Sequence, residues 1–325
     1  MDYLVPTSTV PSGRRETESA AVPATVRAAF APPASLEAAQ LYTRQLALGH
    51  YENFSVVSLL LPKRLRQDFC NVYAFCRTAD DLSDEIADRS ASLEYLGQFK
   101  EHTRACFQGQ PMSPLFVALS ATIERHQIPI DSFLDLIDAF EQDQRMDRYS
   151  DFPQLVDYCR RSADPVGRLV LYMCGYRDPD RQRLSDRTCT ALQLANFWQD
   201  VRRDIRERDR IYIPADSMRR FGVSEERIVK GRCDDNFRQL MKFEVDRTEA
   251  MFDEGEALLP MLDAPVRRHV TLFGQGGRAV LTAIRQQNYD TLTRRPVLSR
   301  WQKGTLIARA MIASTAARLA RRPVA

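Results

Sequence analysis

The feature that most limits how this 325-residue chain can fold is its hydrophobic periodicity, which is helical along nearly the whole length. Sustained alternation of apolar and polar residues, the pattern typical of half-buried strands, is almost missing. Only 13 residues are glycine, which disfavours a turn-rich β architecture. We therefore predict an all-α fold. The predicted helical runs cover about residues 36–49, 65–88, 91–108, 113–126, 131–145, 152–175, 184–210, 234–259, 264–288 and 300–320.

The two ends of the chain differ from this helical interior. Residues 1–36 contain five of the 17 prolines among Ser, Thr and Ala, so we expect a disordered Pro/Ala-rich tail. Beyond Asp290 there is no acidic residue, and basic residues interleave with apolar ones. We predict a basic amphipathic segment at 305–325, which either packs on the core or lies against an anionic membrane. Residues 37–304 are predicted to form one domain.

Composition excludes several classes of protein. A formal net charge of +3 is too small for a general nucleic-acid binder, so we expect no nucleic-acid partner. The seven cysteines are irregularly spaced, which disfavours a disulfide framework or a thiolate zinc site. No run of 18 apolar residues and no signal-like start are visible. We expect a cytoplasmic location and leave open a peripheral contact with the inner membrane face.

Two acidic clusters carry the chemistry of the sequence. In the first, Asp80 and Asp84 are four residues apart and so differ by about 40° around a helix axis, with Asp81 near them. In the second, Asn196, Asp200 and Asp204 form one stripe with Gln193 beside it.

Stacked carboxylates repel one another, so something must compensate their charge. Mg²⁺ does this with a few carboxylates and the oxygens of a substrate phosphate. Two facing stripes therefore predict a diphosphate clamp, in which the metal triggers ionisation of an allylic or cyclopropylcarbinyl carbon. A single stripe is more simply a solvated acidic face with arginine neighbours, but two stripes of similar design favour the clamp.

The two clusters resemble the motifs of the squalene/phytoene synthase family, the trans-type head-to-head isoprenoid synthases, and the similarity covers most of residues 38–304. The family pattern of the second motif is Q-x-x-N-x-x-R-D-x-x-x-D. Several stretches are most similar to the HpnC-type branch, the hydroxysqualene synthases of bacterial hopanoid biosynthesis. These stretches are residues 49–54, 73–81, 158–163 with 165–168, 196–201 and 289–296.

The resemblance implies a single-domain type I isoprenoid synthase fold, a helical bundle around a central cavity, with Mg²⁺ as cofactor. It implies that presqualene diphosphate and water give hydroxysqualene and diphosphate. It also implies a functional partnership with presqualene diphosphate synthase and a flavoenzyme that reduces hydroxysqualene. Three alternatives stay open: a squalene synthase that condenses two farnesyl diphosphates, a phytoene or dehydrosqualene synthase, and a non-catalytic helical scaffold at a membrane surface.

The same resemblance implies roles for individual residues. The metal ligands would be Asp80, Asp81, Asp84, Asn196, Asp200 and Asp204. The catalytic set would be Asp80, Asp84, Asp200, Asp204 and Tyr158. The substrate would contact His50, Tyr51, Phe54, Tyr73, Arg77, Gln193, Asn196, Gln199 and Arg210. The rings of Phe54, Tyr73, Phe197 and Phe273 are candidates for stabilising cations through their faces. For Arg77 an internal salt bridge with Asp80 or Asp81 is an equal alternative.

Departures from the wider family bear on the substrate. Gln199 stands where condensing members usually have Arg, and Glu52 and Asn53 stand where they often have Lys and Ser. These changes remove positive charge that would bind a diphosphate, so we expect a substrate with one diphosphate. Asp164 replaces the Asn expected in the HpnC-type branch, which leaves the role of that position open.

Overall fold

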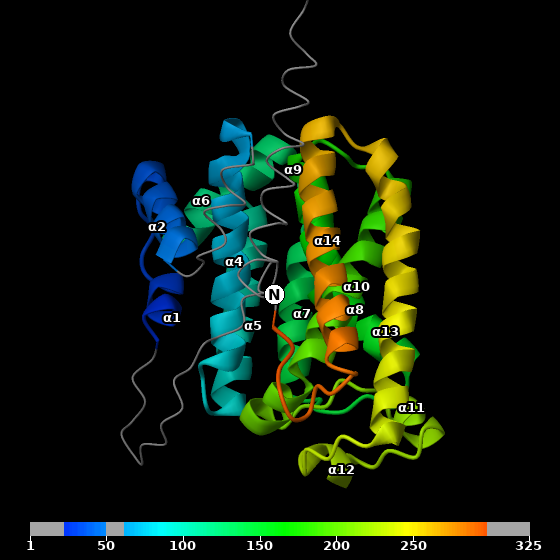
Figure 1. Cartoon of the computed structure of the whole chain (residues 1–325). Coiled ribbons are helices and arrows are strands. Elements are labelled where there is room, and N and C mark those ends of the chain that lie inside the picture. Colours follow the sequence, from blue (N-terminus) through cyan, green and yellow to red (C-terminus); the bar gives the residue numbers. More distant parts are fainter. Residues whose placement is uncertain (1–22, 50–61, 298–325) are drawn as a thin grey trace, which may run out of the picture. The chain divides into compact units, whose positions relative to one another are not determined.

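The computed structural model describes residues 23–49 and 62–297, and it confirms the all-α prediction (Figure 1). Within these residues there is no strand, only one isolated parallel bridge between Arg148 and Ile211. The chain forms two compact units. The α4 unit comprises residues up to 146 together with 161–177, and the α10 unit comprises residues 147–160 together with those from 178 onward.

The α4 unit is built around one largely buried helix. Its elements are α1 (Ala24–Ala29), α2 (Leu36–Gly49), η1 (Lys63–Leu65), α4 (Arg66–Asp84), α5 (Arg89–Phe107), α6 (Pro114–His126), α7 (Asp131–Asp143) and α9 (Asp164–Met173). The ring of Phe75 on α4 lies 5.0 Å from Phe99, 6.4 Å from Phe116 and 4.9 Å from Phe133, centroid to centroid. All four rings are fully buried, so the middle of α4 packs against α5, α6 and α7.

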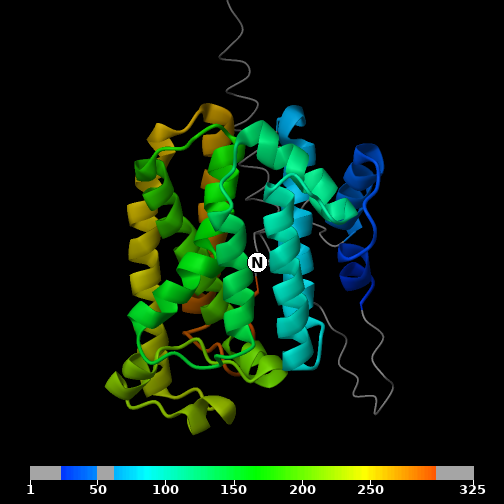
Figure 2. The same ribbon diagram turned by 180° about the vertical axis from the view of Figure 1, so that it is seen from behind.

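The α10 unit has a long helix packed against two others. Its elements are α8 (Phe152–Ser162, whose last two residues belong to the α4 unit), α10 (Pro179–Arg208), α11 (Ala215–Arg220), α12 (Glu225–Val229), α13 (Asp235–Gly255), η2 (Glu256–Met261) and α14 (Ala264–Gln286). Helices α13 and α14 run side by side, and Figure 2 gives the reverse view. The buried Trp198 of α10 donates from Nε1 to Thr248 Oγ1 of α13 at 2.8 Å. This bond fixes α10 against α13 at the level of the second acidic motif.

Proline explains one difference from the predicted helices. The run expected at 152–175 is two helices, α8 and α9, with the break at Ala163. Pro165 follows at the second position of α9, where it lacks the N–H that would continue α8, and its ring would clash with the carbonyl four residues earlier. The prediction of one continuous helix is wrong here for that reason.

The ends of the chain bear on the predicted tail and basic segment. Within the 1–36 segment that we assigned to a tail, residues 24–29 form α1, and both Val26 and Ala29 on this helix are fully buried. Three residues apart on one helical face, these two side chains supply a small apolar contact that the proline content obscured. The predicted basic segment at 305–325 lies outside the described residues. Among the helices that the structure does describe, none has the length and apolarity needed to cross a membrane.

Two glycines of α14 offer a matched test of packing against α10 and α13. A Cβ atom at Gly277 would lie 2.4 Å from Phe252 Cζ and 2.8 Å from Leu192 Cδ2, whereas a Cβ at Gly274 would meet no atom of the described chain within 4 Å. We expect Gly277→Ala to lower the free energy of unfolding by about 1–3 kcal/mol through overpacking. Gly274→Ala should be neutral or raise it by up to about 1 kcal/mol. Urea unfolding measures both, and equal losses would contradict this packing.

Candidate functional site

The first acidic motif occupies the last turns of α4, where the helix is still buried. Asp80 and Asp81 are 4% and 1% exposed, and Asp84, one turn after Asp80, is partly exposed. The helix is continuous through all three residues, as the spacing predicts. Burying carboxylates is costly unless an opposite charge lies close to them. The motif therefore needs a cation.

Arg77 supplies that cation within the protein itself. Its Nη1 lies 3.4 Å from Asp80 Oδ2, and its Nη2 contacts the Asp81 carboxylate and lies 3.0 Å from Glu85 Oε1. Burial raises the pKa of Asp81, and the charge of Arg77 opposes that rise. Of the two roles considered for Arg77, the structure shows the internal salt bridge, and its contact with a diphosphate stays a prediction. Tyr73 lies one turn earlier, and burial raises the pKa of its phenol to about 12, so the hydroxyl is neutral at pH 7.

The second acidic motif lies near the end of α10. Gln193, Asp200 and Asp204 are 8%, 6% and 7% exposed, and Asn196 is partly exposed. Burial is the largest influence on Asp204, and together with the charge of Asp200 it raises the Asp204 pKa to about 8 against the opposing charges of nearby arginines. Burial thus favours the protonated form of this carboxyl more than the nearby arginines favour its ionised form.

The carboxylate of Asp200 is held by an arginine that sequence reasoning did not assign. Arg295 Nη2 lies 3.1 Å from Asp200 Oδ2, and Arg295 Nε contacts the other carboxylate oxygen. Gln199 is 2% exposed, and its Nε2 donates to the carbonyl of Pro296 at 2.6 Å. Its predicted contact with substrate stays a prediction. In the sequence, residues 289–296 stood out only by their resemblance to the family. The two adjacent arginines before Pro296 are the signal that could have pointed to Arg295.

The turn after α10 brings Arg210 to the same motif. Asp209 ends the helix in the left-handed conformation, with φ of 53°. The backbone N–H of Arg210 then donates to the carbonyl of Asp204 at 3.2 Å. Arg210 is 7% exposed, and its charge is one of those that oppose the raised pKa of Asp204. An arginine beside the motif is suited to bind a diphosphate, as predicted for this residue.

Tyr158 belongs to an aromatic cluster in the α10 unit. Phe197 and Tyr212 stack with centroids 3.7 Å apart and planes 6° apart, and Tyr158 lies 6.2 Å and 6.1 Å from them. Tyr149 lies 5.6 Å from Tyr158 and completes the cluster. Sequence reasoning did not find Tyr149 or Tyr212, because the contact of Tyr212 with Phe197 and that of Tyr149 with Tyr212 join segments that are distant in the sequence. Each stacked ring covers a face of the other, which leaves at most one face of Phe197 for a cation.

Other predicted contacts fall elsewhere. His50, Tyr51 and Phe54, with the branch-specific Glu52 and Asn53, lie outside the described residues. Phe273 lies on α14 and is partly buried. For all of these residues the predicted contact with substrate stays a prediction.

The donor set suits a magnesium ion that keeps part of its shell as water and gains further oxygen ligands when a substrate binds. Across residues 23–49 and 62–297, no three His, Cys, Asp or Glu side chains converge into a group that could hold a metal ion. Mg²⁺ usually takes one or two carboxylates and completes its shell with water and phosphate oxygens. Asp200 and Asp204, with the amide oxygen of Asn196 on the same helix, have this chemistry, because they place two carboxylates and one amide oxygen on successive turns of α10. The residues fit a magnesium ion that binds together with a diphosphate.

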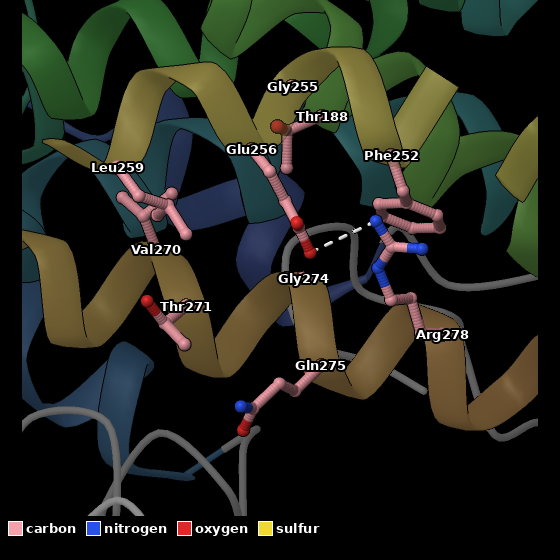
Figure 3. Close-up of a pocket in the computed structure, with 10 residues that line it drawn as sticks. All are labelled: Thr188, Phe252, Gly255, Glu256, Leu259, Val270, Thr271, Gly274, Gln275 and Arg278. Carbon is pink, nitrogen blue, oxygen red and sulfur yellow. Dashed lines mark hydrogen bonds and ion pairs between the residues drawn. The ribbon is translucent and has the colours of Figure 1, made fainter. Parts of the chain in front are cut away.

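A small cavity in the α10 unit does not suit an isoprenoid substrate. It measures about 70 Å³ and lies among α10, α13, η2 and α14, with Arg278 paired to Glu256 at its edge (Figure 3). Ligand pockets are usually about 300–1,000 Å³. None of the predicted site residues lines this cavity, so we assign it no part in catalysis.

The chain is similar in sequence to curated proteins that are named phytoene synthases. The sequence profile of squalene/phytoene synthase matches residues 48–302. The chain is 30% identical over 293 residues to 15-cis-phytoene synthase of Synechococcus elongatus, covering 87% of this chain and 95% of that protein. It is 31% identical over 282 residues to phytoene synthase of Thermus thermophilus, covering 87% and 96%.

Solved structures show the same fold. Squalene synthase HpnC from Alicyclobacillus acidocaldarius matches with a TM-score of 0.76 and 44% identity, over 82% of this chain and 99% of that one. A dehydrosqualene synthase matches with a TM-score of 0.77 at 24% identity, over 86% and 98%. The predicted resemblance is confirmed: the chain belongs to the squalene/phytoene synthase family, whose members are enzymes that act on isoprenyl diphosphates.

Proposed function

We propose that this enzyme is a hydroxysqualene synthase, which converts presqualene diphosphate and water to hydroxysqualene and diphosphate. The observation that carries the proposal is the 44% identity to HpnC over 82% of the chain, against 28–32% to the phytoene synthases. That HpnC protein is named a squalene synthase, so squalene formation is the second candidate.

Position 199 supports a substrate with a single diphosphate. Condensing members usually carry an arginine there, whereas Gln199 is neutral and its amide is bound to the Pro296 carbonyl. Joining two farnesyl diphosphates requires charge for two diphosphates, while presqualene diphosphate has one. The neutral side chain of Gln199 therefore favours presqualene diphosphate, the substrate with one diphosphate.

The proposed roles follow the two acidic motifs. Asp200 and Asp204 with Asn196, and Asp80 and Asp81 with Asp84, would hold Mg²⁺. When bound, the metal would supply positive charge that stabilises the departing diphosphate. Arg210 would bind the same diphosphate through its guanidinium. The carbocation is electrophilic enough to take up water without a general base, so the main task of the side chains is to exclude water from other positions.

Product analysis tests this function. We expect purified full-length protein with Mg²⁺ to convert presqualene diphosphate to hydroxysqualene without NADPH, because water and not hydride ends the reaction. Products are identified by mass, with farnesyl diphosphate and geranylgeranyl diphosphate as parallel substrates. Squalene that forms only with NADPH would favour the second candidate, and a C40 product from geranylgeranyl diphosphate would overturn both.

The carboxylates of α10 should be indispensable. The double variant Asp200→Asn with Asp204→Asn should abolish diphosphate release, since the amides are far weaker ligands for a hard divalent cation. Asp180→Asn is the matched control, because Asp180 is exposed at the start of the same helix. Release of diphosphate is measured across a magnesium titration. Near-normal release by the double variant would refute the role of these two residues.

Arg77 should stabilise the fold as the counter-ion of Asp80 and Asp81, whether or not it also contacts the substrate. Arg77→Met leaves Asp80 and Asp81 buried without their guanidinium, so we expect the metal-free protein to lose about 3–5 kcal/mol of unfolding free energy. Arg104→Met is the control, because Arg104 pairs with Glu101 at the surface. The control should cost less than about 1 kcal/mol. Urea unfolding in EDTA measures both, and equal losses would show that Arg77 does not compensate the motif.

A further inference from the structure

The segment after α14, which we call the strap (residues 287–296), has a fixed internal structure. Asn288 and Tyr289 adopt the left-handed conformation, with φ of 52° and 58°, and turn the chain at the end of α14. Asp290 Oδ1 then accepts from the backbone N–H groups of Leu292 and Thr293 at 3.2 Å and 2.9 Å. Gln287 Nε2 donates to the carbonyls of Asp290 and Arg294, each at 2.5 Å. The strap is therefore a built turn with a defined path.

Two side chains of α10 fasten the strap to the second acidic motif. Arg202 Nη1 donates to the carbonyls of Leu292 and Thr293 at 2.9 Å and 2.6 Å. Gln199 Nε2 donates to the carbonyl of Pro296 at 2.6 Å. Gln199 and Arg202 lie on either side of Asp200 in the sequence. They therefore bind the strap at two points next to Asp200.

Arg295 lies between these two attachments in the sequence, and its Nε and Nη2 each contact one carboxylate oxygen of Asp200. The side chain of Asp200 is 7% exposed, and that of Arg295 is 36% exposed. Gln199 Oε1 also accepts from Arg295 Nη2 at 3.5 Å. A carboxylate has about four lone-pair sites, and a guanidinium that binds both oxygens takes about two of them and balances the carboxylate charge. A magnesium ion that binds Asp200 therefore competes with Arg295 for the same carboxylate.

We propose that the strap holds Arg295 as the resident counter-ion of Asp200, in competition with Mg²⁺, and that Arg202 and Gln199 are positioning residues that set the strength of this competition. The proposal rests on the proposed function in one respect, that Asp200 binds magnesium. Arg202 and Gln199 act through the strap and do not themselves bind the metal. In this proposal the role of residues 289–296 is to hold Arg295 against Asp200, a role that the two acidic motifs by themselves do not reveal.

The test measures magnesium affinity without substrate, by calorimetry on the full-length chain and by the magnesium-dependent shift of the unfolding temperature. Arg295→Gln should bind magnesium about fivefold more tightly, the effect expected for losing a partly exposed ion pair. Arg202→Met should tighten binding by about twofold, since a loosened strap still carries Arg295. Arg202→Lys should lie between Arg202→Met and the natural protein, because it restores one donor.

Arg206→Met is the matched control, because Arg206 is one turn further along α10, exposed, and removes the same charge. It should leave magnesium affinity unchanged. Far-UV circular dichroism excludes unfolding, and Arg202→Lys serves if Arg202→Met does not fold.

Three outcomes would overturn the proposal. The first is unchanged or weaker magnesium binding by Arg295→Gln, or no detectable binding by either it or the natural protein. The second is equal effects of Arg202→Met and Arg206→Met, which would mean that charge alone matters. The third is that Arg295→Gln still tightens magnesium binding when Asp200→Asn is also present, because Arg295 then has no carboxylate at position 200 to pair with. The identity of the product is decided separately, so squalene formation would reject the proposed function and leave these affinities as they are.

Discussion

The pairing of buried carboxylates with guanidinium groups is the interaction on which the site depends. A carboxylate that loses its water and gains no partner is costly, so a helix can carry such groups inward only where a cation is supplied. Arg77 does this for Asp80 and Asp81, and Arg295 does it for Asp200. The apolar packing around α4 and α10 holds the helices, and these ion pairs allow their acidic turns to remain folded when no metal is bound.

The two pairings are built differently, and the difference has consequences. Arg77 lies on the same helix as its partners, three and four residues away, so α4 itself fixes the contact. Arg295 reaches Asp200 from 95 residues away in the sequence, on a strap that depends on Arg202 and Gln199. A local pair persists as long as its helix does, whereas a pair made by a fastened strap can be exchanged for another cation without unfolding α10.

The sequence was sufficient for what depends on local pattern. Most of the helical runs and the stripe of Asp200 and Asp204 follow from periodicity and motif spacing, whereas Arg210 was found through the family resemblance. It was insufficient where distant segments meet. The pair between Arg295 and Asp200 leaves no periodic signal, and α1 lies among prolines that favour a tail. The facing of the two acidic motifs across a shared site was also predicted, and it stays a prediction.

The neutral residue at position 199 has a physical explanation in the strap. Gln199 donates to the Pro296 carbonyl and accepts from Arg295 with the same amide, so it needs a donor and an acceptor on one side chain. An arginine at this position could donate to the carbonyl, but it could not accept from Arg295. It would also place a second positive charge beside the first in a largely buried site. An arginine at position 199 and a strap arginine bound to Asp200 are therefore poorly compatible here, and in this chain Arg295 supplies the positive charge that contacts Asp200.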